Sequence, residues 1–191
     1  MIHLSPVLVI AGSVRPTRIC LQIAEWVAEA GREATGEAYE VVDLKAWPLP
    51  MDDEPDVPAA AADYAHPHTR AWSRKIAGAD AFVFVTPQYN WGYPAALKNA
   101  LDHLYREWTG KPALIVTYGG HGGERCAEQL RQVLQGLRMQ PLAAAPGFTL
   151  TREQIVANTG AISPAADFAD QLDALAAALR ELAAARAVHR P

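Results

Sequence analysis

The chain has 191 residues, 50% of them apolar and 20% charged, which suits one globular domain over residues 1–191 and excludes a disordered or fibrous protein. Its formal net charge of -4 and the lack of a basic run argue against a nucleic-acid partner or an anionic membrane surface. Two distant cysteines, the absence of a signal-like leader and the absence of a membrane-length apolar run together predict a cytoplasmic protein that binds small molecules.

Short apolar runs alternate with helical patterns along the chain. Strands are predicted at residues 7–11, 41–42, 81–85 and 113–116, with a fifth near 142–149. The apolar stripes of the intervening helices comprise Cys20, Ile23, Trp26, Val27 and Ala30; Leu97, Ala100, Leu101 and Leu104; Ala127, Leu130, Leu134 and Leu137; and, after Ser163 as N-cap and Pro164 as first helical residue, Phe168, Leu172, Leu175, Leu179 and Leu182. This alternation predicts an α/β fold with a doubly wound parallel sheet, helices on both faces and ligands at the carboxyl ends of the strands.

The first strand leads into a loop, residues 12–18, that reads Gly-Ser-Val-Arg-Pro-Thr-Arg. Because the loop enters a helix, its N–H groups predict a phosphate cradle, with the hydroxyl and guanidinium groups of Ser13, Arg15, Thr17 and Arg18 as further donors. An ordinary turn with solvated arginines is the alternative. The loop has neither a Gly-Lys-Ser/Thr ending nor the Gly-x-Gly-x-x-Gly pattern, which weakens nucleoside-triphosphate and Rossmann interpretations.

Two further loops follow the third and fourth strands. Residues 86–94 read Thr-Pro-Gln-Tyr-Asn-Trp-Gly-Tyr-Pro, in which Pro87 ends the strand and Pro94 opens a helix. The aromatic turn between the prolines predicts a site for a flat ligand. Residues 117–123 contain four glycines, which let the backbone approach a flat ring, although a flexible turn explains them as well.

His66, His68 and Asp63 resemble a chelating group but lie in the Pro- and Asp-rich stretch 45–69. We interpret this stretch as a solvated loop that forms a rim over the ligand, and we expect no metal site.

Other conspicuous side chains have ordinary interpretations. Cys20 continues an apolar stripe and is expected to be a packed core thiol, whereas His121, among glycines, is expected to be solvated. Three tryptophans are candidates for core packing, an interface or ligand contact: Trp47, Trp72 and Trp108.

The three loops, in this order and each after its own strand, resemble those of the NADPH-dependent FMN reductase family from residue 7 to about residue 150. The resemblance implies a flavodoxin-like fold, a five-stranded parallel sheet in the order 2-1-3-4-5, FMN as cofactor and NADPH or NADH as electron donor. It implies phosphate contacts from Gly12, Ser13, Arg15, Thr17, Arg18 and Ile19, ring contacts from Pro87, Gln88, Tyr89, Asn90 and Trp91, and contacts to the pyrimidine edge from Tyr118, Gly119 and Gly120. Two of these residues depart from the family pattern, because Gln88 stands where many relatives carry Glu and Thr17 where Gly or Ser is commoner.

By the same resemblance, the protein is an oxidoreductase that uses NAD(P)H to reduce bound FMN and then a free flavin, quinone, azo compound or metal oxyanion, by a ping-pong mechanism. Because the flavin carries the chemistry, no catalytic side chain is expected. A homodimer or a dimer of dimers is expected from the resemblance and from clustered aromatic residues: Tyr89, Trp91, Tyr93, Tyr105 and Trp108.

Two other classes of function compete with this interpretation. A flavodoxin-type electron-transfer module would bind FMN but react with a protein partner, and the mild net charge disfavours it. A domain that keeps the fold without a flavin would serve only as an interaction module.

Overall fold

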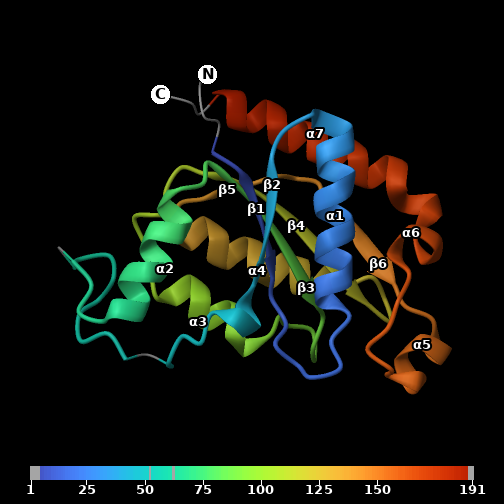
Figure 1. Ribbon diagram of the computed structural model, residues 1–191, viewed down its shortest axis with the longest axis horizontal. Helices are drawn as coiled ribbons and strands as arrows, with labels where there is room; N and C mark the ends of the chain where they lie inside the picture. The colour runs from blue at the N-terminus through green and yellow to red at the C-terminus, as the bar shows by residue number, and fades with distance from the viewer. Residues whose placement is uncertain (1–4, 52, 62, 189–191) are drawn as a thin grey trace.

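A parallel β-sheet forms the centre of the computed structural model, which describes residues 5–51, 53–61 and 63–188 (Figure 1). Its strands are β1 (Val7–Ala11), β2 (Tyr39–Asp43), β3 (Ala81–Pro87), β4 (Pro112–Gly119), β5 (Gln140–Pro141) and β6 (Gly147–Thr149). The order is β2-β1-β3-β4-β5, and β6 also pairs with β4. The predicted parallel sheet in the order 2-1-3-4-5 is confirmed.

The strand register brings the predicted loops to one edge of the sheet. Ala11 at the end of β1 pairs with Val85, and Pro87 at the end of β3 pairs with Tyr118. The loops after β1, β3 and β4 therefore begin side by side. The central strands β1 and β3 are buried along their whole length, because helices cover both faces of the sheet.

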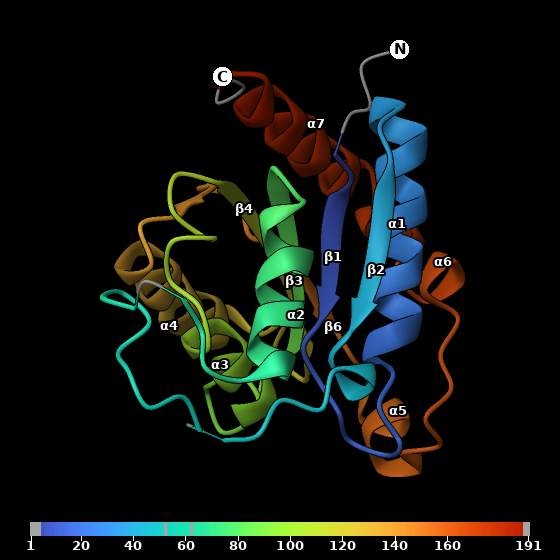
Figure 2. The same cartoon turned by 60° about the vertical axis from the view of Figure 1, so that its left-hand side comes forward.

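Helices pack in two layers against the sheet (Figures 1 and 2). The helical elements are α1 (Cys20–Thr35), η1 (Leu44–Ala46), α2 (Pro67–Ala77), α3 (Ala95–Asp102), α4 (Glu124–Gly136), α5 (Arg152–Ala157), α6 (Pro164–Asp167), η2 (Ala169–Gln171) and α7 (Leu172–Val188). Apolar residues of α1 and α7 form one core cluster with alternate residues of β1 and β3, and those of α2, α3 and α4 form a second cluster on the opposite face. Helices on both faces, as predicted, are thus confirmed.

The fifth strand position is interrupted. β5 pairs with the start of β4 and β6 pairs with its end, while residues 143–145 leave the ladder between them. The N–H of Leu142 still donates to the Ala113 carbonyl at 2.9 Å, and the N–H of Thr117 to the Pro146 carbonyl at 3.0 Å. Pro141 and Pro146 lack the N–H group that a continuous ladder needs. The guanidinium of Arg131 on α4 donates instead to the carbonyl groups of Leu142 and Ala143.

Helix boundaries differ from the predicted ones at several points. Pro94 is the N-cap of α3 and Ala95 is its first residue, a shift of one position. Pro164 does begin a helix, as predicted, but the backbone breaks at Phe168, which lies in the core, so the expected single helix is divided into α6, η2 and α7. The other four residues of the predicted stripe all lie on α7.

The stretch 45–69 is not simply a solvated loop. Helix α2, which the sequence analysis did not name, begins at Pro67, and the side chains of Tyr64 and Thr69 are buried. None of the helices in the described part of the chain combines the length and the hydrophobicity that a membrane crossing requires.

Candidate functional site

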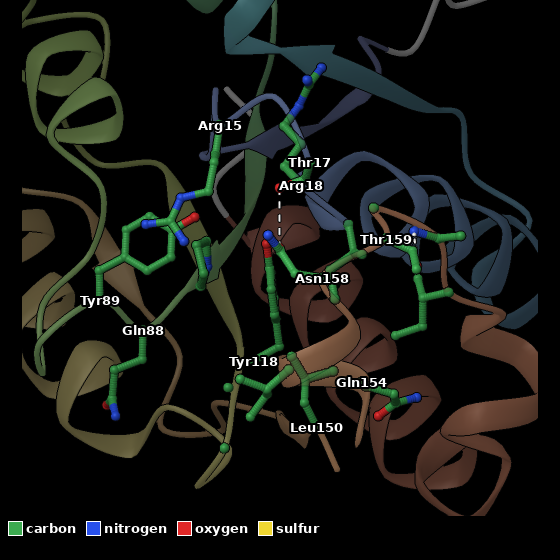
Figure 3. A pocket seen from close by; sticks show the side chains of 18 residues that line it. Arg15, Thr17, Arg18, Gln88, Tyr89, Tyr118, Leu150, Gln154, Asn158 and Thr159 are labelled. Carbon is green, nitrogen blue, oxygen red and sulfur yellow. Dashed lines mark hydrogen bonds between the residues drawn. The ribbon is translucent and has the colours of Figure 1, made fainter. Parts of the chain in front are cut away.

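A cavity of about 340 Å³ lies at the carboxyl edge of the sheet (Figure 3). This volume falls within the range of small-molecule sites. The loops after β1, β3 and β4 form part of its wall, as the strand register predicts, and a fourth segment after β6 forms the rest. Ten of the predicted site residues line it: Arg15, Thr17, Arg18, Ile19, Pro87, Gln88, Tyr89, Tyr118, Gly119 and Gly120.

Four predicted site residues do not line this cavity. Gly12 is packed against Leu97, where a Cβ atom would approach the leucine side chain to 3.0 Å. Ser13 is buried beneath the loop. Asn90 and Trp91 occupy the left-handed tip of a turn after β3, with φ angles of 49° and 71°, and are exposed.

Arg15 and Tyr89 connect the first two loops. The guanidinium of Arg15 lies 4.0 Å from the centroid of the Tyr89 ring, a cation–π arrangement. The Tyr89 hydroxyl lies 3.0 Å from Oγ of Ser13. Ser13 therefore supports the site through Tyr89, although it does not line the cavity.

The donor groups of the first loop fit a phosphate. Arg18 forms an ion pair with Asp43 at the end of β2, with an N···O distance of 2.5 Å, and its buried Nε has no hydrogen-bond partner among the described residues. Arg15 forms no ion pair with the described residues. One unneutralised guanidinium and an unsatisfied N–H group on the same loop suit a dianionic ligand such as the FMN phosphate.

The glycine loop after β4 is a tightly built turn rather than a loosely flexible one. At Gly123, φ is +91° and a Cβ atom would lie 2.7 Å from Cβ of Thr117, so only glycine fits there. The Thr117 hydroxyl donates to the carbonyl of Gly122 at 2.7 Å. The backbone N–H of Gln88 donates to the carbonyl of Tyr118 at 2.9 Å, which joins this loop to the turn after β3.

The side chains that line this cavity are poorly suited to acid–base catalysis. Among the described lining residues there is no carboxylate and no imidazole. Tyr118 is only 4% exposed, and burial raises its pKa far above the usual range. Burial likewise raises the pKa of the neighbouring Cys20 to about 11, so its thiol stays protonated and packs in the core, as predicted.

The fourth wall of the cavity was missed by the sequence analysis. Its lining residues are Leu150, Gln154, Ile155, Asn158, Thr159, Gly160, Ala161 and Ile162. A local signal for the helix was present, because Thr151 and Gln154 have capping-box spacing, and the structure shows both reciprocal hydrogen bonds, at 3.2 and 2.9 Å. Nothing in that signal indicates where the helix packs.

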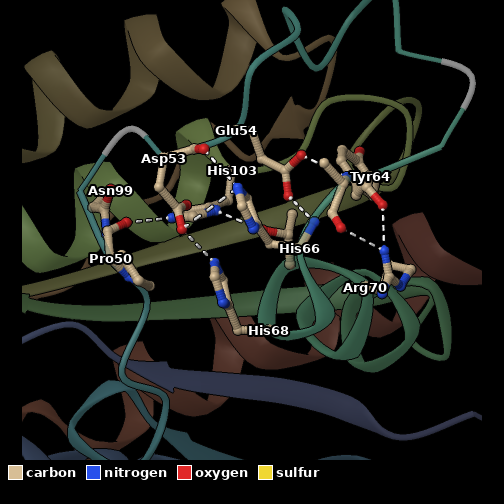
Figure 4. A network of polar contacts seen from close by, with 11 residues as sticks. Pro50, Asp53, Glu54, Tyr64, His66, His68, Arg70, Asn99 and His103 are labelled. Carbon is tan, nitrogen blue, oxygen red and sulfur yellow. Dashed lines mark hydrogen bonds and ion pairs between the residues drawn. The ribbon is translucent and has the colours of Figure 1, made fainter.

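The histidines near α2 form polar contacts away from the cavity (Figure 4). Nε2 of His68 lies 2.8 Å from Oδ2 of Asp53, and Nε2 of His66 lies 2.8 Å from the Asp53 carbonyl oxygen. Asp63 takes no part and accepts instead from the N–H of Tyr64. Within the described residues, no three His, Cys, Asp or Glu side chains are arranged to hold a metal ion.

The structure also shows where His121 and the three tryptophans lie. His121 is exposed, as predicted, and borders a second cavity, of about 530 Å³, on the other side of the glycine loop. Trp72 and Trp108 are fully buried. Trp47 is partly buried, with its ring centroid 5.1 Å from that of Trp72. All three tryptophans therefore belong to core packing.

Comparison with known proteins agrees with this geometry. Residues 5–149 match the family model described as NADPH-dependent FMN reductase. An NAD(P)H-dependent FMN reductase of Schizosaccharomyces pombe is 56% identical over 176 residues, which cover 92% of this chain and 87% of that protein. One of Saccharomyces cerevisiae is 52% identical over 141 residues, covering 69% and 74% of the two chains.

The fold is shared with solved structures as well. An oxidoreductase from Corynebacterium diphtheriae superimposes with a TM-score of 0.72 at 22% identity, over 98% of this chain and all of that one. The family match spans most of the chain, and the relative from S. pombe is more than half identical to it. The chain therefore belongs to the NADPH-dependent FMN reductase family and is an oxidoreductase that uses FMN and NAD(P)H.

Proposed function

We propose that the cavity at the carboxyl edge of the sheet holds FMN, and that NAD(P)H and a small acceptor use the open face of the flavin in turn, by a ping-pong mechanism. The observation that carries this proposal is the convergence of three loops on one cavity. They bring phosphate donors, an aromatic wall and a glycine-rich edge within the dimensions of a small-molecule site. A cavity without carboxylate or imidazole groups suits a reaction whose chemistry resides in the cofactor.

In this proposal, the residues of the chain bind FMN and orient it for reaction with its substrates. Arg15 and Arg18 hold the phosphate together with the loop N–H groups, that of Thr17 among them, while the Thr17 hydroxyl donates to Oδ1 of Asn158. Ser13 and Gly12 support that loop. Pro87, Gln88 and Tyr89 flank the ring, and Tyr118, Gly119 and Gly120 approach its polar edge. Asn90 and Trp91, at the exposed tip of the turn, border the face that stays open to substrates.

When bound, FMN supplies a hydride acceptor at N5 and passes electrons on. The side chains need only hold the reactants about 3 to 3.5 Å apart, because a well-oriented approach makes the step effectively unimolecular. In this proposal, backbone N–H groups near Asn90 and near Gly119 stabilise the added negative charge of the reduced ring. The acceptor class includes quinones, which is supported by relatives named quinone reductases, and extends to free flavins, azo compounds and metal oxyanions.

The proposal also includes the cellular location and the oligomeric state of the protein. We expect a cytoplasmic location, which is supported by two free, buried cysteines. We also expect a homodimer or a dimer of dimers, supported by the 59% exposure of Trp91 on the turn after β3.

Steady-state kinetics test the mechanism. The protein is titrated with FMN by absorbance, and NAD(P)H oxidation is then followed under nitrogen at several concentrations of a quinone. Parallel double-reciprocal lines are expected for a ping-pong scheme. Micromolar FMN binding with negligible NAD(P)H oxidation would favour an electron-transfer module, and the absence of FMN binding would favour a flavin-free interaction domain.

A further inference from the structure

The fourth wall of the cavity is a segment that we call the α5 segment, residues 150–162. It lies beyond residues 5–149, which match the family model. Even so, it contributes eight of the 18 residues that line the cavity. A segment with this share of the lining has a direct influence on what the cavity accepts.

The α5 segment closes directly onto the phosphate loop (Figure 3). The hydroxyl of Thr17 donates to Oδ1 of Asn158 at 3.1 Å, and Nε2 of Gln22 donates to the Gly160 carbonyl at 3.1 Å. A Cβ atom on Gly160 would lie only 3.3 Å from Cα of Thr17. The phosphate loop and this part of the segment are therefore in direct contact.

Helix α5 itself has few buried contacts, although Leu150 and Ile162 at the ends of the segment pack against the core. All six residues of α5 are described and none is buried, and Ile155 and Val156 are 48% and 73% exposed. Ile155 reaches the opposite wall, where its Cδ1 lies 3.2 Å from a Cβ position built on Gly120. An element with few buried contacts opens at a lower free-energy cost than the core does.

We propose that the α5 segment is the element that selects FMN over FAD and retains FMN in the cavity; this inference rests on the proposed function. FMN ends at its phosphate, whereas FAD continues through a second phosphate to adenosine. With the first phosphate on the loop that contains Arg15 and Thr17, that extension must pass the place where Asn158 and Gly160 contact Thr17. The closed contact accommodates FMN, excludes FAD, and must open for FMN to enter or leave.

Three variants test this inference in the FMN-loaded protein. Asn158→Gly removes the acceptor of the Thr17 hydroxyl, while glycine keeps access to the left-handed backbone at this position, where φ is +41°. Gly160→Ala places a methyl group against Thr17. The matched control for Gly160→Ala is Gly110→Ala. The φ angle of Gly110 is +80°, close to the +74° of Gly160, but a Cβ atom on Gly110 would meet nothing within 4 Å.

The measurements are the rate of FMN release and the ratio of the FAD and FMN dissociation constants, together with a thermal melt. We expect Asn158→Gly and Gly160→Ala to release FMN about three- to tenfold faster and to lower the FAD-to-FMN ratio by a similar factor, which corresponds to one ordinary hydrogen bond. Gly110→Ala is expected to lower the melting temperature while both binding measurements stay as in the wild type.

The outcomes separate the inference from the proposed function. Wild-type protein that binds FMN, with both α5 variants matching Gly110→Ala in release rate and in FAD discrimination, would overturn the inference and leave the proposed function intact. Wild-type protein that does not bind micromolar FMN would overturn the proposed function, and the inference with it.

Discussion

Arg15 and Arg18 enter the cavity from the same loop but differ in how their charge is compensated. The ion pair with Asp43 offsets the charge of Arg18, whose side chain is largely buried at 10% exposure. Arg15 is exposed and stacks on Tyr89. A phosphate arriving at this loop gains more from Arg15, because that guanidinium is not already paired with a carboxylate.

Replacing Arg15 by alanine therefore tests the phosphate site. A charge-assisted hydrogen bond contributes about 1.5 to 3 kcal/mol, so Arg15→Ala is expected to weaken FMN binding about ten- to a hundredfold. Rates at saturating FMN are expected to recover, because the phosphate contacts are the same in the ground and transition states. FMN titrations and thermal melts of Arg15→Ala and of Arg74→Ala, an exposed arginine on α2, provide the comparison. Equal FMN affinity in the two variants would show that the phosphate binds elsewhere.

At the scale of elements, polar contacts tie residues 50–54 to α2 and α3 (Figure 4). Glu54 accepts from the backbone N–H groups of Ala65 and His66, at 2.8 and 3.0 Å, just before α2 begins. Nε2 of His103, which follows α3, lies 2.8 Å from the carbonyl of Pro50. These contacts explain why a stretch rich in Pro and Asp is ordered against the helices instead of extending into solvent.

None of the described residues in the stretch 45–69 lines the cavity, so the predicted rim over the ligand is not found there. The carboxylates of residues 50–54 instead make the stability of the fold depend on pH. Desolvation raises the pKa of Asp53, but the hydrogen bond with His68 and the nearby His66 and His103 outweigh it, so the pKa lies below its ordinary value. A carboxyl group whose pKa is lower in the folded state stabilises the fold above its unfolded pKa and loses that contribution as the pH falls through the folded pKa. For Asp53, the loss is expected below about pH 4.

Melting temperatures of Asp53→Asn and of the wild type, recorded from pH 7 down to pH 3, test this pH dependence. The difference between them is expected to shrink as the pH falls below about pH 4. Asp56→Asn serves as the control, because Asp56 lies on the same stretch and is exposed. A difference for Asp53→Asn that stays constant over the whole range would rule out the contribution of this carboxylate.

At the scale of the whole molecule, the two core clusters leave one aromatic side chain conspicuously exposed. Trp108, which the sequence analysis counted with the surface aromatic residues, is fully buried, and Tyr105 packs partly against the core. Trp91 remains 59% exposed, with the guanidinium of Arg125 4.1 Å from its ring centroid. Large exposed apolar side chains of this kind are typical of interfaces.

We therefore expect a two-fold dimer with Trp91 at or near the interface. Light scattering at micromolar concentration is expected to report twice the chain mass for the wild type, and Trp91→Ser is expected to shift the protein towards monomer without lowering its melting temperature as a core substitution would. A monomer at every concentration tested would refute the expected assembly.

Residue patterns along the chain were enough to predict the layered α/β architecture. Uninterrupted apolar runs such as residues 81–85 indicate strands buried on both faces, and apolar residues spaced three and four apart indicate helices with one face on the sheet. Turns, such as the aromatic turn that follows Pro87, could be predicted equally well, because turn and phosphate-binding geometry depend on residues adjacent in the chain.

Only the tertiary structure decided which residues share the cavity. Thr17 and Asn158 are 141 positions apart, and Arg18 and Asp43 are 25 apart, so no local pattern relates them. The α5 helix carries a local capping signal, but its position over the cavity follows from contacts with the phosphate loop and the glycine loop. The interruption of the fifth strand and the outward position of Trp91 likewise depend on long-range packing. Periodicity reports the burial of one element, whereas a site is defined by several elements meeting in space.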